Sequence, residues 1–408
     1  MTILHTADWH LGKYLDRFSR LEEQQAVLEQ IVEIADEHDV DAVIVAGDLF
    51  DSFNPPNEAS ELLYSTLHRL AKNGSRAVIA IAGNHDSPER VDMPDVLARV
   101  SGILFVGMPM AESKPFETTR GLKTIQIDKG FVELQLPQCD FPLRLILTPY
   151  ANELRLKKYL GSENRDESLR TVLQKHWTEL ADKYCDETGV NMLVTHLFIM
   201  QKGGEQPEEP EGEKAILVGG SQPIFTENIP PQIQYVALGH LHRSQNLGDN
   251  QQPVVYSGSP LAYSFAEASQ KKYVHLVHAK PGKPVSMERV ELKQQFDLYQ
   301  NKFEGVDEAV SWLETVQESY VQLSLKVEKY LSAVDKRRIS DAHERIVSIV
   351  PEITDGFSGT EQRAVNINEQ SMEILFDQFF QSKKGVLPDD ALKDLFREIQ
   401  NIEEQKAE

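Results

Sequence analysis

Short polar motifs recur through the first 250 residues, and each one follows a run of apolar, β-branched residues. The motifs supply carboxylate, carboxamide and imidazole groups: Asp8 and His10, Asp48 and Asp51, Asn84 and His85, His196, and His240 and His242. One such motif is weak evidence, because Gly-Asp and Gly-Asn are common turn dipeptides. Five motifs in succession, each at the end of an expected strand, favour a metal site.

The mixture of ligand types narrows the chemistry of that site. Imidazole together with carboxylate oxygen suits manganese, iron or zinc better than calcium. Two such ions, roughly 3.5–4 Å apart and sharing one carboxylate, would activate a water and neutralise phosphate oxygens during in-line displacement. The motifs therefore predict an enzyme that hydrolyses a phosphate ester.

An alternation of strands and amphipathic helices would position these groups, and it predicts a layered α/β domain. We expect strands at 2–6, 41–46, 76–82, 191–195, 235–238, 254–257 and 272–278, and helices at 20–38 and 58–72, the second ending near Gly74. Every motif then lies beyond the carboxyl end of a strand, where open α/β sheets place their sites. Glycines at 47, 83 and 239 would allow sharp turns that bring the following ligand close.

The chain divides into three expected parts. Residues 1–278 form the layered domain, with an exposed loop of Gly, Glu and Pro at 201–222; residues 280–284 look like a linker into a second domain at 279–367. The remaining segment, 368–408, contains two short amphipathic helices at 371–381 and 388–402. Their apolar content is large for a terminal pair, which indicates a partner surface; docking back on the chain's own core is the alternative.

Composition limits the function further. The 408 residues carry a formal net charge of −22, so any contact with nucleic acid must be local. No apolar run approaches the roughly 20 residues that span a bilayer. No export signal is evident, and two distant cysteines suggest no disulfide framework. We therefore expect a cytoplasmic, nucleoid-associated protein with no membrane partner.

The motif series resembles that of the calcineurin-like metallophosphoesterase superfamily: Asp-x-His, Gly-Asp-x-x-Asp, Gly-Asn-His-Asp, His and Gly-His-x-His. Over residues 1–278 it is similar, more narrowly, to the nuclease subunits of bacterial ATP-driven nuclease complexes, on segments such as His-Thr-Ala-Asp-Trp-His-Leu-Gly and Tyr-Ser-Gly-Ser-Pro. The resemblance implies a layered β-sandwich flanked by helices, a small α+β DNA-capping domain and a C-terminal helical pair.

The resemblance also implies individual roles. One ion is expected on Asp8, His10, Asp48 and His242, and the other on Asp48, Asn84, His196 and His240. His85 matches the family's catalytic histidine, which protonates the leaving oxygen or stabilises the charged phosphate. Asp51 is expected to orient His85.

By the same resemblance, the activity would be a two-metal DNA phosphodiesterase, cutting double-stranded ends as an exonuclease and hairpins or single strands as an endonuclease, in repair, recombination and replication. Mn²⁺ is the expected metal, with Mg²⁺ the alternative, and ATP would be consumed by a coiled-coil ATPase partner. Candidate DNA contacts are basic residues that are otherwise read as solvated helix faces: Arg17, Arg20, Lys336, Arg337 and Arg338. Helices 20–38 and 58–72 would supply a homodimer interface, although packing within the chain explains the same pattern.

Two other functions compete with this one. An enzyme of the same superfamily could act on small phosphoesters, but such a substrate gives no reason for the last 130 residues. A non-catalytic subunit could keep the fold without the metals, but the intact set of ligands opposes it.

Overall fold

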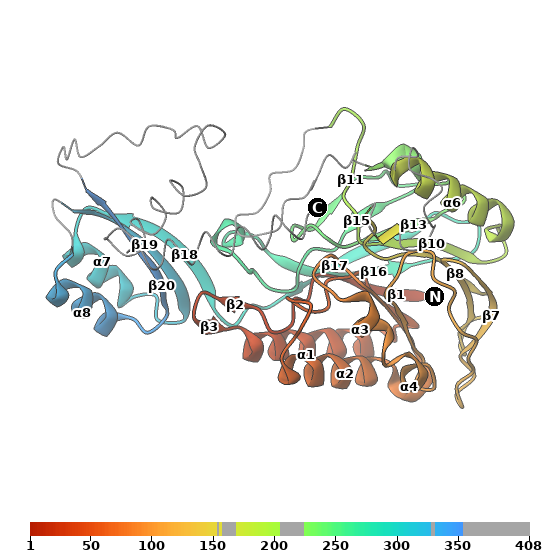
Figure 1. Ribbon diagram of the computed structural model, residues 1–408, viewed down its shortest axis with the longest axis horizontal. Helices are drawn as coiled ribbons and strands as arrows, with labels where there is room; N and C mark the ends of the chain where they lie inside the picture. The colour runs from red at the N-terminus through yellow and green to blue at the C-terminus, as the bar shows by residue number, and fades with distance from the viewer. Residues whose placement is uncertain (153–154, 157–168, 205–223, 328–330, 354–408) are drawn as a thin grey trace, which may run out of the picture. The chain divides into compact units, whose positions relative to one another are not determined.

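The computed structural model describes residues 1–152, 155–156, 169–204, 224–327 and 331–353. Two β-sheets stack face to face in residues 1–292 (Figure 1). The first has the order β17-β16-β1-β4-β5-β6, from strands Ser286–Leu292, Lys272–His278, Thr2–Thr6, Ala42–Val45, Ala77–Ile81 and Ile103–Val106. Strands β1, β4, β5 and β6 run parallel, so their carboxyl ends share one edge.

The second sheet has seven strands in the order β14-β15-β13-β10-β9-β8-β7. Their bounds are Gln245–Asn246, Val254–Tyr256, Tyr235–Leu238, Val190–Thr195, Leu143–Thr148, Phe131–Gln135 and Lys123–Asp128. Strands β9, β10, β13 and β15 are parallel, which again gathers carboxyl ends at one edge.

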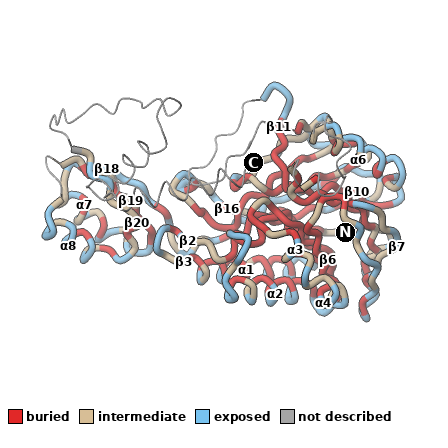
Figure 2. Tube along the Cα trace, in the orientation of Figure 1, coloured by how far each residue is buried: buried red, intermediate tan, exposed pale blue. Residues whose placement is uncertain are grey.

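Side-chain alternation sets the layers. In β4, Ala42 and Ile44 face the second sheet, whereas Val43 and Val45 face the helices α1 (Leu21–Glu37) and α2 (Asn57–Leu70). The short helices α3 (Pro88–Asp92) and α4 (Asp95–Arg99) follow on the same side, and α6 (Leu169–Tyr184) covers the second sheet. Figure 2 shows the buried strands between exposed helix faces. The domain is thus a four-layer α/β/β/α arrangement with an apolar core between the sheets.

Residues 297–353 form a smaller α+β unit. Its sheet has the order β18-β19-β20, from Asp297–Phe303, Ser319–Val327 and Ile346–Ile353, with helices α7 (Val306–Leu313) and α8 (Ala333–Ala342). These elements share their own core around Val321, Leu323 and Ile339. A second apolar cluster joins this unit to the larger one through Leu15, Ala262, Leu298 and Tyr320.

Short elements complete the described chain: β2 (Tyr14–Leu15) with β3 (Phe18–Ser19), β11 (Ile199–Met200) with β12 (Ile224–Phe225), and the 3₁₀ turns η1 (Lys72–Gly74), η2 (Thr226–Asn228) and η3 (Phe265–Glu267). No helix within the described ranges is both long and apolar enough to cross a bilayer.

The seven strands and two helices expected within residues 1–278 are confirmed to within two residues at each end. Strands β6, β7, β8 and β9 and helix α6 were not expected. Residues 280–284 turn between β16 and β17 of the same sheet rather than leaving the domain, because β17 pairs with β16 along its length. The tail helices and most of the 201–222 loop lie outside the described residues, and the three-part division stays a prediction.

Candidate metal centre

The ends of five strands converge where the two sheets meet. Residues that follow β1, β4 and β5 in the first sheet approach residues that follow β10 and β13 in the second: Asp8, Asp48, Asn84, His196 and His240. Backbone hydrogen bonds continue the β1–β4 pairing past the strands, from Asp8 N to Gly47 O at 3.0 Å and from His10 N to Asp48 O at 2.9 Å. The first two motifs are therefore held side by side before any ion binds.

Glycine is required at three of these turns. A Cβ at Gly47, whose φ is +94°, would lie 2.2 Å from His196 Nδ1; one at Gly83 would lie 2.1 Å from Asp48 Oδ1; and one at Gly239 would lie 1.9 Å from Ala46 O. These distances are far below van der Waals contact. The expectation that these glycines let the ligand loops approach each other is confirmed.

Three overlapping groups of side chains each offer one ligand atom per residue, with the atoms of a group within 4.8 Å of one another: Asp8, His10 and His242; Asp8, Asp48 and His196; and His10, Asp51 and His85. His10 Nε2 lies 3.0 Å from His242 Nε2, and His196 Nε2 lies 3.2 Å from Asp48 Oδ2. Asn84 Oδ1 lies 2.9 Å from His196 Nε2 and 3.0 Å from His240 Nδ1. All seven expected ligands thus meet in one cluster.

The backbone is strained at these positions. Asp8, His10, Asp48 and His240 have φ angles of 54°, 45°, 48° and 99°, in the region that non-glycine residues seldom adopt. Such strain persists only where the surroundings impose it, and it concentrates at functional sites. Here it aims four potential ligands at a common point.

The polar atoms of the cluster fit divalent cations. Asp8, His10, Asp48, His196 and His242 are at most 2% exposed. Asp8 Oδ2 is buried with no hydrogen-bond partner among the described residues, while Asp8 Oδ1 accepts from His240 N at 2.8 Å. Buried carboxylates and imidazoles without partners are costly, and coordination of a metal removes that cost.

Electrostatics point the same way. Burial raises the pKa of Asp8 to about 7, against the opposing influence of His196 and His242. Burial lowers the pKa of His196, but the Asp48 and Asp8 carboxylates outweigh it and raise that pKa to about 9. Charged groups are therefore crowded in the cluster, and a divalent cation would offset the negative charge of its carboxylates.

His85 stands beside the ligands. Its Nδ1 donates to the backbone carbonyl of Asp51 at 2.8 Å, which fixes the ring, and its Nε2 is buried without a hydrogen-bond partner within the described residues. The ring lies edge-on to His10, with centroids 4.8 Å apart. We expected the Asp51 carboxylate to contact His85, but it does not. It lies 2.9 Å from Lys13 Nζ and 3.6 Å from His10 Nδ1. Asp51 thus orients His85 through its main chain.

Sequence reasoning missed several residues that hold the ligand loops. The buried Asp86 carboxylate accepts from Leu49 N, Phe50 N and Gly83 N at 2.8–3.0 Å, which ties two motifs together. Arg155 donates to Gly83 O and Asp86 O across the same loop. Asp86 belongs to a recognised motif, so its position offered a signal; Arg155 lies in no motif.

The basic residues expected at DNA differ in their surroundings. Arg20 is 1% exposed, pairs with Glu23, donates to Ala262 O at 2.9 Å and stacks on Tyr320, so its guanidinium is used inside the protein. Arg338 pairs with Asp307 at 2.6 Å. Arg17, which lies over the Phe18 ring, is exposed, as are Lys336, Arg337 and Arg338 on α8; Arg337 Nε lies 3.9 Å from the Asp341 carboxylate. The helix-start position of Arg20 gave no sign of its burial.

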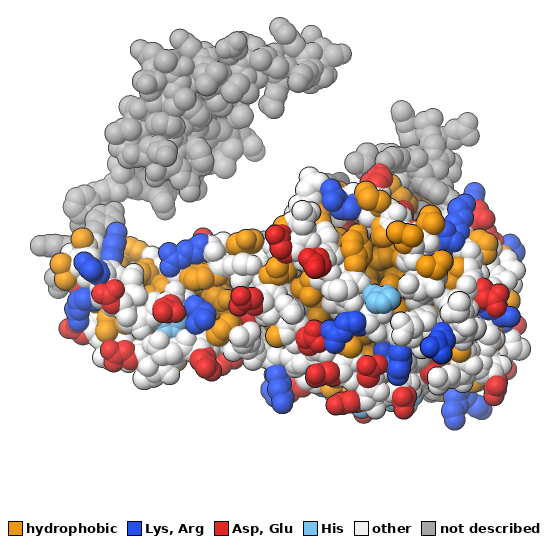
Figure 3. All heavy atoms as spheres, turned by 90° about the horizontal axis from the view of Figure 1, so that it is seen from below, with side chains coloured by type: hydrophobic (Ala, Val, Ile, Leu, Met, Phe, Trp, Pro, Cys, Tyr) orange, Lys and Arg blue, Asp and Glu red, His pale blue; other side chains and the backbone are white. Residues whose placement is uncertain are grey.

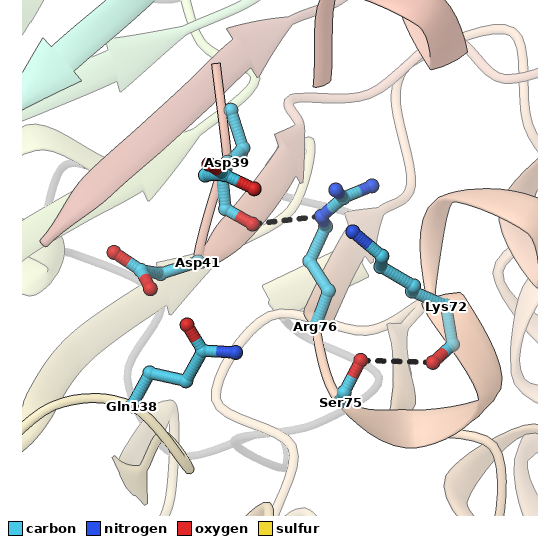
Figure 4. Close-up of a pocket in the computed structure, with 7 residues that line it drawn as sticks. Asp39, Asp41, Lys72, Ser75, Arg76 and Gln138 are labelled. Carbon is cyan, nitrogen blue, oxygen red and sulfur yellow. Dashed lines mark hydrogen bonds between the residues drawn. The ribbon is translucent and has the colours of Figure 1, made fainter. Parts of the chain in front are cut away.

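A second polar hollow lies at the opposite, amino ends of β4 and β5 (Figure 4). It encloses about 50 Å³ and is lined by Asp39, Val40, Asp41, Lys72, Ser75, Arg76 and Gln138. Arg76 donates to Val40 O, Leu70 O and Ala35 O and pairs with Asp36. Its guanidinium is thus already occupied by the protein.

Fold and site together define a metal-dependent phosphoesterase. A family model described as calcineurin-like phosphoesterase matches residues 1–244, and the chain belongs to that family. Among its relatives, a Bacillus subtilis (strain 168) protein named as the D subunit of the nuclease SbcCD is 32% identical over the whole of both chains. Proteins of the same name are 33% identical in Rhodobacter capsulatus, over 65% of this chain and 64% of theirs, and 29% identical in Escherichia coli K12, over 83% and 81%. Within the family, this chain therefore groups with the SbcCD D subunits.

Proposed function

We propose that the protein is a two-metal DNA phosphodiesterase. The observation that carries the proposal is the convergence of two carboxylates, one carboxamide and four imidazoles on one buried point, from five separated stretches of sequence. Such a donor set serves hydrolysis of phosphate esters. Its DNA substrate is supported by the relatives that carry the name of a nuclease subunit.

Asp8, His10, Asp48 and His242 would hold one ion, and Asp48, Asn84, His196 and His240 the other. When bound, the two cations supply the charge that activates water and neutralises phosphate oxygens. Asp48 would be shared by the two ions; support comes from its Oδ2, which lies 3.2 Å from His196 Nε2 and 3.6 Å from His10 Nε2. Mn²⁺ is the proposed metal because imidazole and carboxylate are mixed, with Mg²⁺ the alternative.

His85 acts on the substrate rather than on a metal in this proposal. Because Nδ1 donates to Asp51 O, the lone pair or proton available to the substrate is at Nε2. From there it would protonate the leaving 3′ or 5′ oxygen, or hydrogen-bond the developing charge on the phosphate.

The relatives are named as one subunit of the nuclease SbcCD, which supports a partner protein for this chain. We propose an SbcC-type coiled-coil ATPase as partner, which consumes the ATP, with residues 368–408 as the segment that binds it. Double-stranded DNA ends and hairpins are the proposed substrates in the cytoplasmic nucleoid, for repair, recombination and replication. Residues 297–353 would act as the DNA-capping unit, with Lys336 and Arg337 as contacts, and Arg17 of the larger domain would add a further contact. Arg338 is less available to DNA because it pairs with Asp307.

A homodimer is proposed on a different surface from the one expected. The apolar faces of α1 and α2 pack into the chain's own core, as at Leu28, Leu63 and Leu67. Four large apolar side chains on and beside α4 are instead 69–78% exposed: Met93, Val96, Leu97 and Val100. Figure 3 views the face that carries these helices, where apolar side chains gather among charged ones. An exposed apolar patch of this kind suits the interface of a two-fold dimer.

The central experiment is digestion of an end-labelled DNA hairpin with Mn²⁺, with a cyclic nucleotide as the competing small substrate. Cleavage of the hairpin alone supports the proposal, whereas turnover of the cyclic nucleotide alone would identify a small-phosphoester enzyme. Copurification with a coiled-coil ATPase, followed by the same assay with and without ATP, tests the partner. Leu97→Glu should convert a dimer into a monomer in light scattering.

A further inference from the structure

A buried acid–base pair lies directly behind one of the histidines of the metal cluster. Glu267 ends the 3₁₀ turn η3 and Lys272 begins strand β16; they are 1% and 2% exposed and form an ion pair. Neither residue belongs to a metal-ligand motif. Burying two opposite charges is expensive and adds little net stability, so a structural role alone does not account for the pair.

Both members of the pair touch His242. Glu267 Oε1 accepts from His242 Nδ1 at 3.3 Å, and Lys272 Nζ donates to the backbone carbonyl of His242 at 3.1 Å. Further contacts hold the pair itself: Glu267 accepts from Tyr263 N and from Ser264 Oγ, and Lys272 donates to Ser259 Oγ at 2.9 Å. Glu267 thus holds the ring of His242, and Lys272 holds its backbone.

The contact is on the far side of the ring from the cluster. His242 Nε2 faces His10 Nε2 at 3.0 Å, whereas Nδ1 faces Glu267. We infer that Glu267, paired with Lys272, is a positioning residue that sets the Nδ1–H tautomer of His242 and turns its Nε2 lone pair toward the ion. The inference rests on the metal role proposed for His242.

The other imidazoles are supported differently. His196 Nδ1 donates to the carbonyl of Ala46 at 2.8 Å, a neutral acceptor. His10 Nδ1 lies 3.6 Å from the Asp51 carboxylate, beyond hydrogen-bond distance. A charged acceptor makes an imidazole more basic and hence a better ligand, and loss of such a partner typically weakens metal affinity about 10–100-fold. Glu267 should therefore strengthen the ion on Asp8, His10 and His242 selectively.

Contacts on both sides hold the Glu267 carboxylate in place. It forms an ion pair with Lys272 on one side and accepts from His242 Nδ1 on the other. A neighbouring pair on the surface, Lys271 with Glu291 at 2.9 Å, offers the same two residue types without contact to the cluster.

The test is calorimetric titration of the metal-free, full-length chain with MnCl₂, with electron paramagnetic resonance to follow single and paired ions. The wild type should bind two Mn²⁺. Glu267→Gln should weaken one of the two about 10–100-fold and leave the other unchanged. Glu291→Gln, the matched control, should leave both affinities at wild-type values.

Glu267→Gln leaves the Lys272 charge buried without its partner, so the double variant Glu267→Gln/Lys272→Met removes both charges together. The same selective loss is expected. Wild-type affinity at both ions, or an equal loss at both, in either folded variant would overturn the inference. Failure of the wild type to bind Mn²⁺ would instead overturn the proposed function.

A measurement on the wild type needs no variant to fold. With ¹⁵N-labelled histidine and Mg²⁺ bound, the nitrogen spectrum should report His242 as the Nδ1–H tautomer with a hydrogen-bonded proton. A proton on Nε2 would contradict the role of Glu267.

Discussion

Opposite ends of the strands β4 and β5 carry similar polar side chains in contrasting states. At the carboxyl ends, Asp48 has a left-handed backbone, and the neighbouring Asp8 and His85 each keep a buried atom without a partner within the described chain. At the amino ends, Arg76 is equally buried, but its guanidinium meets three carbonyls and one carboxylate.

This difference distinguishes buried side chains that could bind a ligand from buried side chains that stabilise the fold. Buried polar groups in folded proteins nearly always have partners, so buried atoms that lack one among the described residues, such as Asp8 Oδ2 and His85 Nε2, indicate a place where a ligand binds. A satisfied group such as Arg76 rigidifies the fold and offers nothing to a ligand. Residue type alone does not distinguish these cases, whereas the state of each donor and acceptor does.

The largest expected effect is at the shared carboxylate. Asp48→Asn keeps an oxygen for His85 N, now 2.8 Å from Asp48 Oδ1, and Asn tolerates the left-handed backbone. The negative charge that would bridge two cations is lost, which removes several kcal/mol of transition-state stabilisation. Hairpin cleavage with Mn²⁺ should fall by about 10⁴-fold. Folding in the presence of a chelator, followed by circular dichroism, should be nearly unchanged. Normal cleavage by Asp48→Asn would contradict the contrast between the carboxyl and amino ends of β4 and β5.

His85→Gln should have the next largest effect. Glutamine retains a polar group beside the cluster but cannot transfer a proton, so cleavage should fall by about 10³-fold. Mn²⁺ affinity and DNA binding should stay at wild-type values, because His85 Nδ1 is bonded to the Asp51 carbonyl rather than to a ligand. Single-turnover cleavage measures the loss of catalysis, and Mn²⁺ titration measures the metal affinity separately. Unchanged cleavage would remove His85 from the mechanism.

How far these residues could be predicted from sequence depends on whether their role is local. Asp48 and His85 sit in short motifs at strand ends, so spacing alone identified them. Glu267 and Lys272 act on His242 from 25 and 30 residues away, without a motif of their own. Arg20 looked like a surface residue because its partner ring, Tyr320, comes from the smaller unit.

For the fold too, local sequence patterns were predictive, whereas contacts between distant residues were not. Strands β1, β4 and β5 are buried on both faces and appear as continuous apolar runs, which predicted them well. Strand β7 has only exposed and half-buried residues, in no regular alternation, at a sheet edge, and β9 carries Arg144 among its apolar residues, so their patterns were weaker. Arg144 is buried because Asp186 and Thr188 meet it from beyond the end of α6, which sequence spacing does not reveal.

At the amino ends the expected effect is on stability. Arg76→Met keeps the apolar stem but leaves the carbonyls of Val40, Leu70 and Ala35 without their donors. Urea unfolding should show a loss of about 3 kcal/mol. Cleavage per folded molecule should not change. Lys72→Met is the matched control, since its exposed 3.9 Å pair with Asp36 should contribute less than about 0.5 kcal/mol. A loss of Mn²⁺ affinity in Arg76→Met would show that the two ends are coupled.

The smallest effect concerns a carboxylate near the carboxyl end of β6 that does not join the cluster. Asp92 Oδ1 accepts from Gly107 N at 2.6 Å, just beyond β6, and burial, with Asp95 and Glu89 adding to it, raises the pKa of Asp92 to about 6. Because the folded-state pKa lies above the unfolded value near 3.8, the stabilisation is complete below about pH 3.8 and is lost as pH rises through 6. Asp92→Asn keeps the acceptor without the charge. It should therefore be more stable than the wild type by about 1 kcal/mol at pH 8, after solvent screening of this half-buried group, and the advantage should shrink toward pH 4. If the stability difference between Asp92→Asn and the wild type in urea unfolding does not vary with pH, the Asp92 carboxylate is not held as described. A loss of cleavage in Asp92→Asn would instead show that Asp92 contributes to the metal centre.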